Sequence, residues 1–173
     1  VASEQRDARR QPLRRLKSWE PTMTALTAAS GMLIRRPLDV VREAFLDPAV
    51  TTRFWFTHST GRLEPGAVVT WTWAMYGVST RVRVKAVEAA RILVEWDIDS
   101  GPTEVEWTFS SRGGHCFVQV TNPIPDGDVA KALDSTGGFS LVMAAAKIWL
   151  EHAIAPRIVE DRHPDHHAAG WTG

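Results

Sequence analysis

The feature that most constrains this chain is a regular alternation of apolar and polar residues that begins after Gly66. Five segments place apolar residues at every second position: 67–76, 78–87, 91–98, 103–111 and 115–122. Successive side chains of a β-strand point to opposite faces, so this period predicts five consecutive strands. The first of them carries Trp71 and Trp73, two of the eight tryptophans in the chain.

The short loops between these segments predict how the strands pair. Opposite residues in an antiparallel hairpin have numbers of constant sum, so each loop sets a register. Loops at Gly77-Val78, 88–90, 99–102 and Gly113-Gly114 predict these opposite pairs: Trp73 with Val82, Trp71 with Val84, Val84 with Val94, Val82 with Trp96, Trp96 with Trp107, Phe109 with Val118, and Trp107 with Val120. Every pair sets apolar against apolar, which a slip of one residue would destroy. On the other face the same register predicts two ion pairs, Arg83 with Glu95 and Arg81 with Asp97.

The tryptophans of these strands therefore share one face of the predicted sheet, which we call the aromatic floor. An apolar face cannot meet water, and one long amphipathic helix, from Gly138 to about His163, is available to cover it. Its apolar stripe contains Phe139, Val142, Met143, Ala146, Trp149, Leu150 and Ala153. Alanines at 144–146 make this helix thin, which predicts a space above the floor. Pro156 predicts a kink or an end of the helix.

Three further elements are predicted before the alternating region, and one after it. "GMLIRRP" is typical of a short strand that begins at Gly31. "PLDVVREAFLDP" predicts a helix, because Pro37 suits the first turn and the apolar residues fall on one stripe. Asp47 ends that helix and can cap another over "PAVTTRFW". After the strands, a short helical turn is expected at 128–134.

Length and composition are typical of one globular domain. The chain has 173 residues, 44% of them hydrophobic, and a formal net charge of zero. A neutral chain has no global field to attract nucleic acid or an anionic membrane surface, so we expect neither partner. No apolar run approaches the length of about 18 residues that predicts a transmembrane helix. The single cysteine, Cys116, cannot form an internal disulfide, which favours a reducing cytoplasm.

The two ends of the chain differ from its middle. Residues 1–22 contain six basic and three acidic residues and few apolar ones. This composition predicts a disordered basic arm. Alternatively, translation starts at Met23 and the arm is not part of the native protein. We therefore predict a single domain over residues 23–163 and a flexible tail over 164–173.

No motif of a familiar catalytic or cofactor site occurs in the sequence. Patterns for dinucleotide binding, phosphate loops, zinc proteases and paired cysteines are absent. The inward strand positions carry no ionisable acid or base, so we predict no catalytic residue, metal or cofactor. Cys116 points inward and is interpreted as a small core residue rather than a nucleophile. Ionisable or hydroxyl side chains are expected only at the mouth of the space: Arg53, His58, Tyr76 and His152.

One histidine-rich motif allows two interpretations. "HPDHH" brings His163, Asp165, His166 and His167 close together, and such residues could bind a divalent metal. The simpler interpretation is a frayed tail with adventitious affinity, so we assign no metal site.

The order of predicted elements resembles the helix-grip fold of the START-like (SRPBCC) superfamily, which includes the birch-pollen-allergen fold and polyketide cyclases. Within it, the chain is most similar to bacterial homologues of the activator of heat-shock-protein-ninety ATPase. The segments that carry this resemblance are "RRPLDVVREAFLDPAVTTRFW", "GRLEPGAVVTWTW", "VKAVEAARILVEW" and "TGGFSLVMAAAKIWLEHA". The resemblance covers roughly residues 30–163. It implies an α+β fold, in which an antiparallel sheet of about seven strands wraps round the C-terminal helix with a cavity between them.

The resemblance does not imply one activity. We expect the cavity to bind a small hydrophobic molecule, aromatic rather than aliphatic, although the tryptophans could equally fill a solid core. The alternatives are a polyketide cyclase-like or hydrolase-like enzyme, which we favour less, and a chaperone ATPase co-factor that acts through its surface. A homodimer or a chaperone partner stays open. The residues expected to contact the ligand are Trp55, Trp71, Trp73, Val82, Val84, Trp96, Trp107, Phe139, Met143, Ala146 and Leu150.

Overall fold

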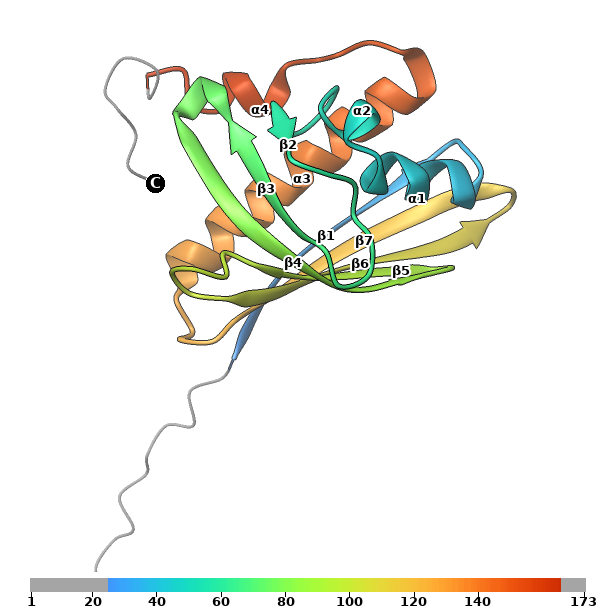
Figure 1. Ribbon diagram of the computed structural model, residues 1–173. Helices are drawn as coiled ribbons and strands as arrows, with labels where there is room; N and C mark the ends of the chain where they lie inside the picture. The colour runs from blue at the N-terminus through green and yellow to red at the C-terminus, as the bar shows by residue number, and fades with distance from the viewer. Residues whose placement is uncertain (1–24, 166–173) are drawn as a thin grey trace, which may run out of the picture.

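Seven strands form one antiparallel sheet in the order β1-β7-β6-β5-β4-β3-β2, and a long helix, α3, lies across its concave face (Figure 1). The computed structural model describes residues 25–165. This is the α+β helix-grip arrangement predicted from the sequence. In chain order the elements are β1 (Leu26–Ile34), α1 (Leu38–Leu46), α2 (Pro48–Thr51), β2 (His58–Ser59), β3 (Val68–Trp73), the 3₁₀ turn η1 (Ala74–Tyr76), β4 (Val78–Glu88), β5 (Arg91–Trp96), β6 (Thr103–Arg112), β7 (His115–Ile124), α3 (Val129–His152) and α4 (Ile158–Asp161).

The two short helices α1 and α2 begin where the sequence predicts them, but α2 ends at Thr51 and does not extend to Trp55. The apolar stripe of α1 is buried, and the helix packs against β6 and β7. Asp47 ends α1 and caps α2, because its side chain accepts a 2.9 Å hydrogen bond from the N–H of Ala49. The chain that leaves α2 places Trp55 in the core, where 7% of its surface is exposed.

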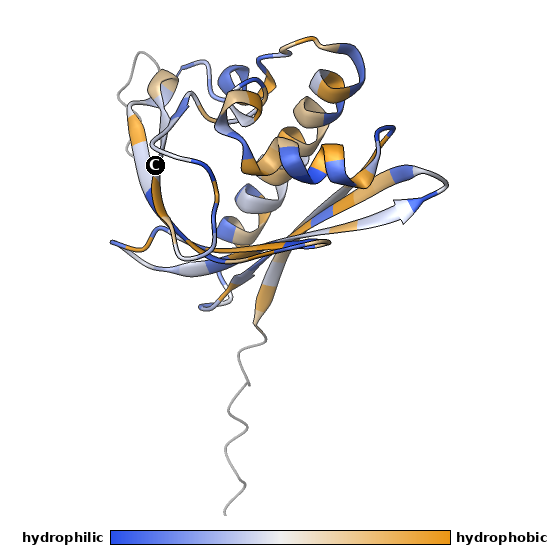
Figure 2. Cartoon of the chain, turned by 45° about the vertical axis from the view of Figure 1, so that its right-hand side comes forward, coloured by the Kyte–Doolittle hydropathy of each residue, from blue (hydrophilic) through white to orange (hydrophobic). Residues whose placement is uncertain are grey.

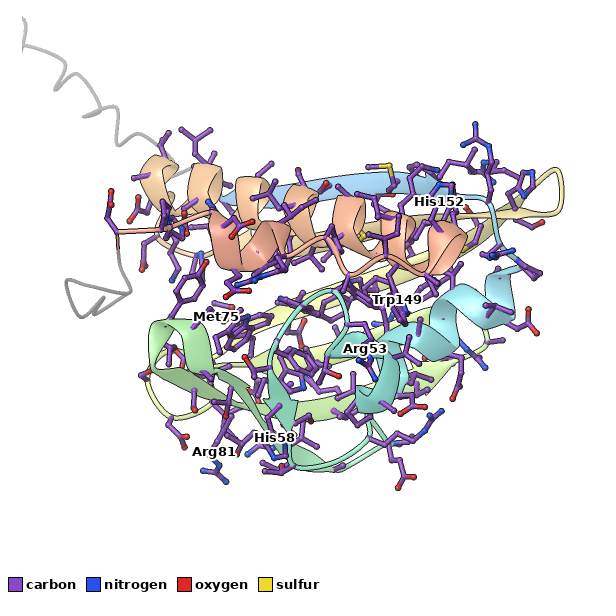
Figure 3. All side chains as sticks on the ribbon, turned by 90° about the horizontal axis from the view of Figure 1, so that it is seen from above. Arg53, His58, Met75, Arg81, Trp149 and His152 are labelled. Atoms are coloured by element: carbon purple, nitrogen blue, oxygen red, sulfur yellow. The ribbon has the colours of Figure 1, made fainter. Side chains whose placement is uncertain are left out.

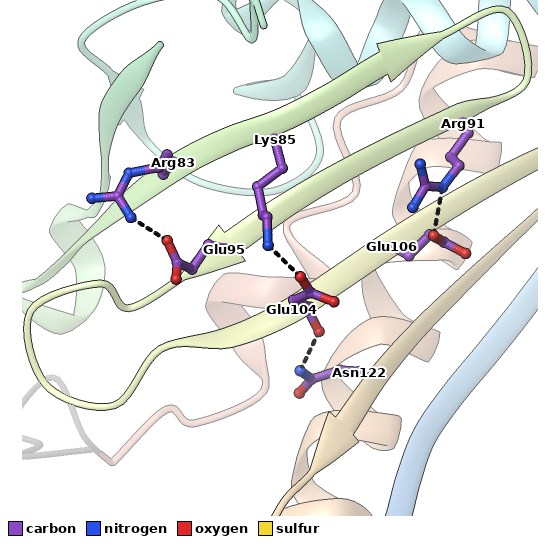
Figure 4. Close-up of polar contacts among 7 residues, drawn as sticks. All are labelled: Arg83, Lys85, Arg91, Glu95, Glu104, Glu106 and Asn122. Carbon is purple, nitrogen blue, oxygen red and sulfur yellow. Dashed lines mark hydrogen bonds and ion pairs between the residues drawn. The ribbon is translucent and has the colours of Figure 1, made fainter. Parts of the chain in front are cut away.

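The predicted assignment of the sheet faces is confirmed, and Figure 2 shows hydrophobic and hydrophilic residues alternating along the strands. On the inner face, Trp71 and Trp107 are each 1% exposed. On the outer face, cationic and anionic side chains of β4, β5 and β6 form ion pairs (Figure 4). The pairs are Arg83 with Glu95, Lys85 with Glu104 at 2.5 Å, and Arg91 with Glu106 at 2.6 Å.

The predicted register is confirmed for the β6–β7 hairpin and for part of the β4–β5 hairpin, and it is wrong for two connections. Phe109 lies opposite Val118, and Val84 lies opposite Val94, as predicted. Beyond Val84, a β-bulge shifts the register and Glu88 lies opposite Arg91, so the predicted loop at 88–90 is shortened to residues 89–90. In the β3–β4 hairpin, however, Trp73 lies opposite Val78, because η1 and Gly77, with φ of 65°, form a longer connection than the predicted turn. Trp71 consequently lies opposite Thr80 instead of Val84, although it stays on the inner face. Trp107 keeps its predicted partner Val120 on β7.

The second wrong connection joins β5 to β6. Trp96 lies opposite Thr103 rather than Trp107. The reason is that β5 ends at Trp96, and Asp97 adopts a left-handed φ of 56° that opens a turn. Arg81 accordingly forms its ion pair with Asp99, at 2.8 Å, and not with Asp97 as predicted.

Helix α3 is longer at its beginning and shorter at its end than the sequence predicts. It begins at Val129, where the side chain of Asp128 accepts a hydrogen bond from the N–H of Lys131 at 3.0 Å. The predicted turn at 128–134 and the predicted helix from Gly138 are therefore one element. The helix ends at His152 and Ala153 follows with a φ of 57°, so Pro156 lies beyond the end. Residues 153–163, which we call the strap, include α4 and are not part of the long helix.

Helix α3 packs mainly along β1. Polar contacts fasten the two elements at one end: Lys147 donates a 2.9 Å hydrogen bond to the carbonyl of Leu33, and the N–H of Arg35 donates to Glu151 at 2.6 Å. Both elements carry small residues that are fully buried, among them Ala28 on β1 and Ala146 on α3. The helix backbone therefore approaches the β1 side of the sheet closely.

The predicted terminal segments are mostly outside the described residues. This holds for the basic arm over 1–22 and for all but the first two residues of the tail over 164–173. The boundaries of the single domain thus stay a prediction. Within residues 25–165, no helix combines the length and the apolar character needed to cross a membrane.

Candidate functional site

A cavity of about 460 Å³ lies between the sheet, the first half of α3 and the strap. It forms where β3, β4 and β5 curve away from the β1 side, against which α3 is packed (Figure 1). Its lining residues are Trp55, Trp73, Tyr76, Val78, Ser79, Thr80, Trp96, Asp97, Ser100, Gly101, Thr103, Val105, Asn122, Lys131, Asp134, Ser135, Gly138, Phe139, Leu141, Val142, Val159, Arg162 and His163.

One wall of the cavity is aromatic. The rings of Trp73 and Trp96 are stacked, with centroids 5.9 Å apart and planes inclined by 27°. Trp55 lies 5.7 Å from Trp96, and Phe139 of α3 meets Trp96 edge to face at 6.4 Å. Such offset and edge-to-face contacts hold the rings in place, so the wall is a rigid apolar surface.

The cavity is lined by polar groups where β5 ends and β6 begins, and we call this region the polar end of the cavity. The carboxylate of Asp97 accepts hydrogen bonds from Ser100, at 2.6 Å, and from Thr80, at 3.4 Å. Asn122, 6% exposed, donates from its amide nitrogen to Thr103 Oγ1 at 3.1 Å and to the carbonyl of Glu104 at 2.8 Å. The cavity is therefore amphipathic.

The strap closes one side of the cavity and is fastened at two places. Arg162 pairs with Asp134 of α3, at 2.7 Å, and lies directly against Gly138. Tyr76 of η1 donates a hydrogen bond to the carbonyl of Val159. Burial raises the pKa of Tyr76 above its usual value, so the hydroxyl keeps its proton and this bond at neutral pH.

Of the residues predicted to contact a ligand, four line the cavity: Trp55, Trp73, Trp96 and Phe139. Six others lie in the packed core, each no more than 1% exposed: Trp71, Val82, Val84, Trp107, Met143 and Ala146. Leu150 packs against the core at the far end of α3 and does not line the cavity. The thin middle of α3 does not leave a space, because its small residues bring the helix closer to the sheet. The cavity is thus displaced toward the beginning of α3.

Among the predicted mouth residues, Tyr76 alone lines the cavity. Figure 3 shows Arg53 beside Trp149, where its guanidinium lies 5.7 Å from the ring centroid, and His58 apart from both. His58 and His152 are exposed. None of these three side chains lines the cavity.

The remaining chemical candidates give no reactive centre. Cys116 is fully buried, as its interpretation as a core residue requires, and burial raises its pKa to about 11. A thiol with such a pKa is not a nucleophile at neutral pH. Within residues 25–165, no group of three metal-ligating side chains is close enough to hold an ion. His166 and His167 of the tail motif lie outside that range.

Comparison with known proteins agrees with this geometry. The model of the family described as "Activator of Hsp90 ATPase homolog 1-like protein" matches residues 35–145, which is more than half of the chain. The chain belongs to this family. This is the activator-homologue family of the START-like superfamily, which the sequence segments quoted above were found to resemble. A search of curated proteins finds no significant match.

Solved structures similar to this family member show the same fold. Protein SSP2350 from Staphylococcus saprophyticus is 25% identical, with a TM-score of 0.68 over 75% of this chain and 94% of that one. The Aha1 dimer from Colwellia psychrerythraea is 12% identical, with a TM-score of 0.66 over 73% and 97%. DynU16, described as a protein in the dynemicin biosynthetic locus, is 19% identical, with a TM-score of 0.69 over 75% of this chain. This chain spans about half of DynU16, since 48% of that chain is covered.

The sequence interpretation missed most of the polar residues that line the cavity, among them Asp97, Asn122 and Arg162. The sequence did contain a signal for Asn122, because it stands two residues after Val120 and therefore on the same inward face of β7 as Val118 and Val120. No local signal existed for Arg162, because a chain reversal after α3 brings it to Asp134.

Proposed function

We propose that this protein binds a small hydrophobic molecule, aromatic in character, in the cavity between the sheet, α3 and the strap. The observation that carries the proposal is the rigid wall of Trp55, Trp73, Trp96 and Phe139 beside a cavity of about 460 Å³. Small-molecule sites are mostly apolar, with volumes of roughly 300–1,000 Å³ and a few convergent polar groups. A flat ring placed against this wall gains both buried area and aromatic contacts.

The enzyme alternative has one observation in its favour. Tyr76, Asp97 and His163 line the cavity, and each type of side chain can act in acid–base chemistry. The similarity to DynU16, a protein of a biosynthetic locus, agrees with the handling of small molecules in this fold. Tyr76 already donates a hydrogen bond to the strap, and Asp97 already accepts one from Ser100. We therefore favour a binding function over a catalytic one.

The chaperone alternative depends on the outer surface. The family description names an ATPase activator, and the outer face of the sheet carries many charges. Arg83, Lys85 and Arg91 are all paired with carboxylates on β5 or β6, however. A partner would have to compete with these pairs, so the surface offers a weaker argument than the cavity.

Isothermal calorimetry and thermal unfolding with 2-naphthol test the proposal. We expect binding that raises the melting temperature as the probe concentration rises. Ser135 lines the cavity from α3, so Ser135→Phe should fill space and abolish binding. Leu133→Phe is the matched control, since Leu133 lies on the same helix and is 69% exposed.

Two results would overturn the proposal: no stabilisation by any of a panel of aromatic probes, or binding that Ser135→Phe leaves unchanged. Mass spectrometry of the probe after incubation addresses the enzyme alternative, because a changed mass would show turnover.

A further inference from the structure

We propose that the cavity selects aromatic molecules that carry a hydroxyl or N–H group, and that Asn122 Oδ1 accepts the hydrogen bond from that group. This inference rests on the proposed function, because it names the chemical class that the same cavity takes. The observation behind it is a polar side chain on the inner face of β7, where the neighbouring inward residues are apolar. Asn122 follows Val118 and Val120 on the inner face of β7, and both of these are fully buried.

The orientation of the Asn122 amide follows from its partners. One partner is the main-chain carbonyl of Glu104, at 2.8 Å, which can only accept a hydrogen bond (Figure 4). The atom that faces it must therefore be the amide nitrogen. The second hydrogen of the same nitrogen goes to Thr103 Oγ1, at 3.1 Å. Both donors of the amide are thus used, and its oxygen is the remaining polar group.

That oxygen accepts no hydrogen bond from the part of the chain that the structure describes. It is also not sealed inside the protein. Within residues 25–165, the sealed side-chain atoms without a partner are Arg42 Nε and Trp107 Nε1. Asn122 is 6% exposed and lines the cavity, so the open side of its amide is the cavity itself.

The surroundings of Asn122 favour a donor on the ligand. Asp97, at the same polar end, presents a carboxylate that accepts hydrogen bonds from Ser100 and Thr80. Arg162 also lines the cavity, but its Nη2 is committed to Asp134. A ring on the tryptophan wall with a hydroxyl toward Asn122 satisfies both halves of the cavity. A ligand without a donor leaves a desolvated acceptor unpaired, which weakens binding.

The amide also has a structural role that must be separated from recognition. The β6–β7 pairing stops at Glu106 and Thr121, and the Asn122 side chain takes over by binding the carbonyl of Glu104. If this were its only role, replacing Asn122 would alter stability and would not alter which probes bind.

The test compares 2-naphthol, which has a donor, with 2-methoxynaphthalene, which has nearly the same shape and no donor. We expect the wild-type protein to bind 2-naphthol about tenfold more tightly, the effect of one hydrogen bond worth about 1.4 kcal/mol. In Asn122→Leu, the ratio of the two affinities should fall to about one-tenth of its wild-type value. Comparing ratios removes the difference in hydration between the probes. Gln119→Leu, the same change on the exposed face of β7, should keep the wild-type ratio.

Each outcome decides one question. Equal affinity of both probes for the wild-type protein, or an unchanged ratio in Asn122→Leu, would overturn the inference and leave the proposed function standing. Failure of both probes to bind would overturn the proposed function. If Asn122→Leu does not fold, the ¹³C shift of Asn122 Cγ in the wild-type protein decides instead. It should move with 2-naphthol and not with 2-methoxynaphthalene; equal movement would overturn the inference.

Discussion

Arg162 lies so close to Gly138 that a Cβ atom on this glycine would stand 2.7 Å from Arg162 Nη1. The arginine belongs to the strap and the glycine to α3, so this contact fastens the two where they enclose the cavity. It also explains why the helix contains two adjacent glycines, which are poor helix formers. Their lack of side chains allows the guanidinium to reach Asp134, at 2.7 Å.

Gly138→Ala should loosen the strap without unfolding the helix. The new methyl group meets the end of a flexible side chain, and alanine favours a helix over glycine by about 1 kcal/mol. We expect faster hydrogen exchange of the amides in 153–163 and little change in the free energy of unfolding. Gly137→Ala is the control, since its Cβ would stand 3.3 Å from Arg162 Nη2 and needs only a small shift. Equal exchange in the two variants would contradict this account.

Ala146→Trp should overpack the core rather than fill the cavity. Ala146 is fully buried and does not line the cavity, so the larger ring has no space. We expect a loss of roughly 1–3 kcal/mol or more in the free energy of unfolding, measured with denaturant. Ala130→Trp, at an exposed position of the same helix, should change it by no more than about 0.5 kcal/mol. A stable Ala146→Trp protein that no longer binds aromatic probes would place the cavity where the sequence alone predicts it.

Double-mutant cycles should detect the corrected register on the outer face. Arg81 and Asp99 form an ion pair with side chains 50% and 56% exposed, for which we expect a coupling energy of about 0.2–1 kcal/mol. The coupling between Arg81 and Asp97 should be near zero, because Asp97 binds Ser100 and Thr80 instead. The opposite order of the two coupling energies would support the register predicted from the sequence.

Stability should fall at alkaline pH in a way that depends on Cys116. Burial raises the pKa of this thiol from 9.0 to about 11, so the unfolded state releases the proton first as the pH rises. Deprotonation therefore favours unfolding between pH 9 and about 11, and the thiol destabilises nothing below that range. Cys116→Ala should lack this part of the decline, measured as the difference between the two unfolding free energies across the range. A difference that is independent of pH would show that the thiol is not desolvated.

Local sequence determined the faces of the strands and the first helices. A strand has a period of two residues, so the alternation along 115–122 was enough to place Cys116 and Val118 inward. The same rule extends to Asn122, where the polar residue at an inward position was a readable signal. Helix α1 needed only its apolar stripe and Asp47 at its end, both of which act within a few residues.

Tertiary structure decided the lengths of two connections, the bounds of α3 and the position of the cavity. The register at Trp73 and Trp96 depends on backbone conformations at Gly77 and Asp97 that the sequence pattern does not specify. Helix α3 begins at Val129 and passes through Gly138, against which Arg162, distant in the sequence, packs. The place of the cavity depends on how closely α3 approaches β1, which is the summed result of many side-chain contacts. A periodic pattern states which face a residue occupies, and only the assembled packing states how much space is left above it.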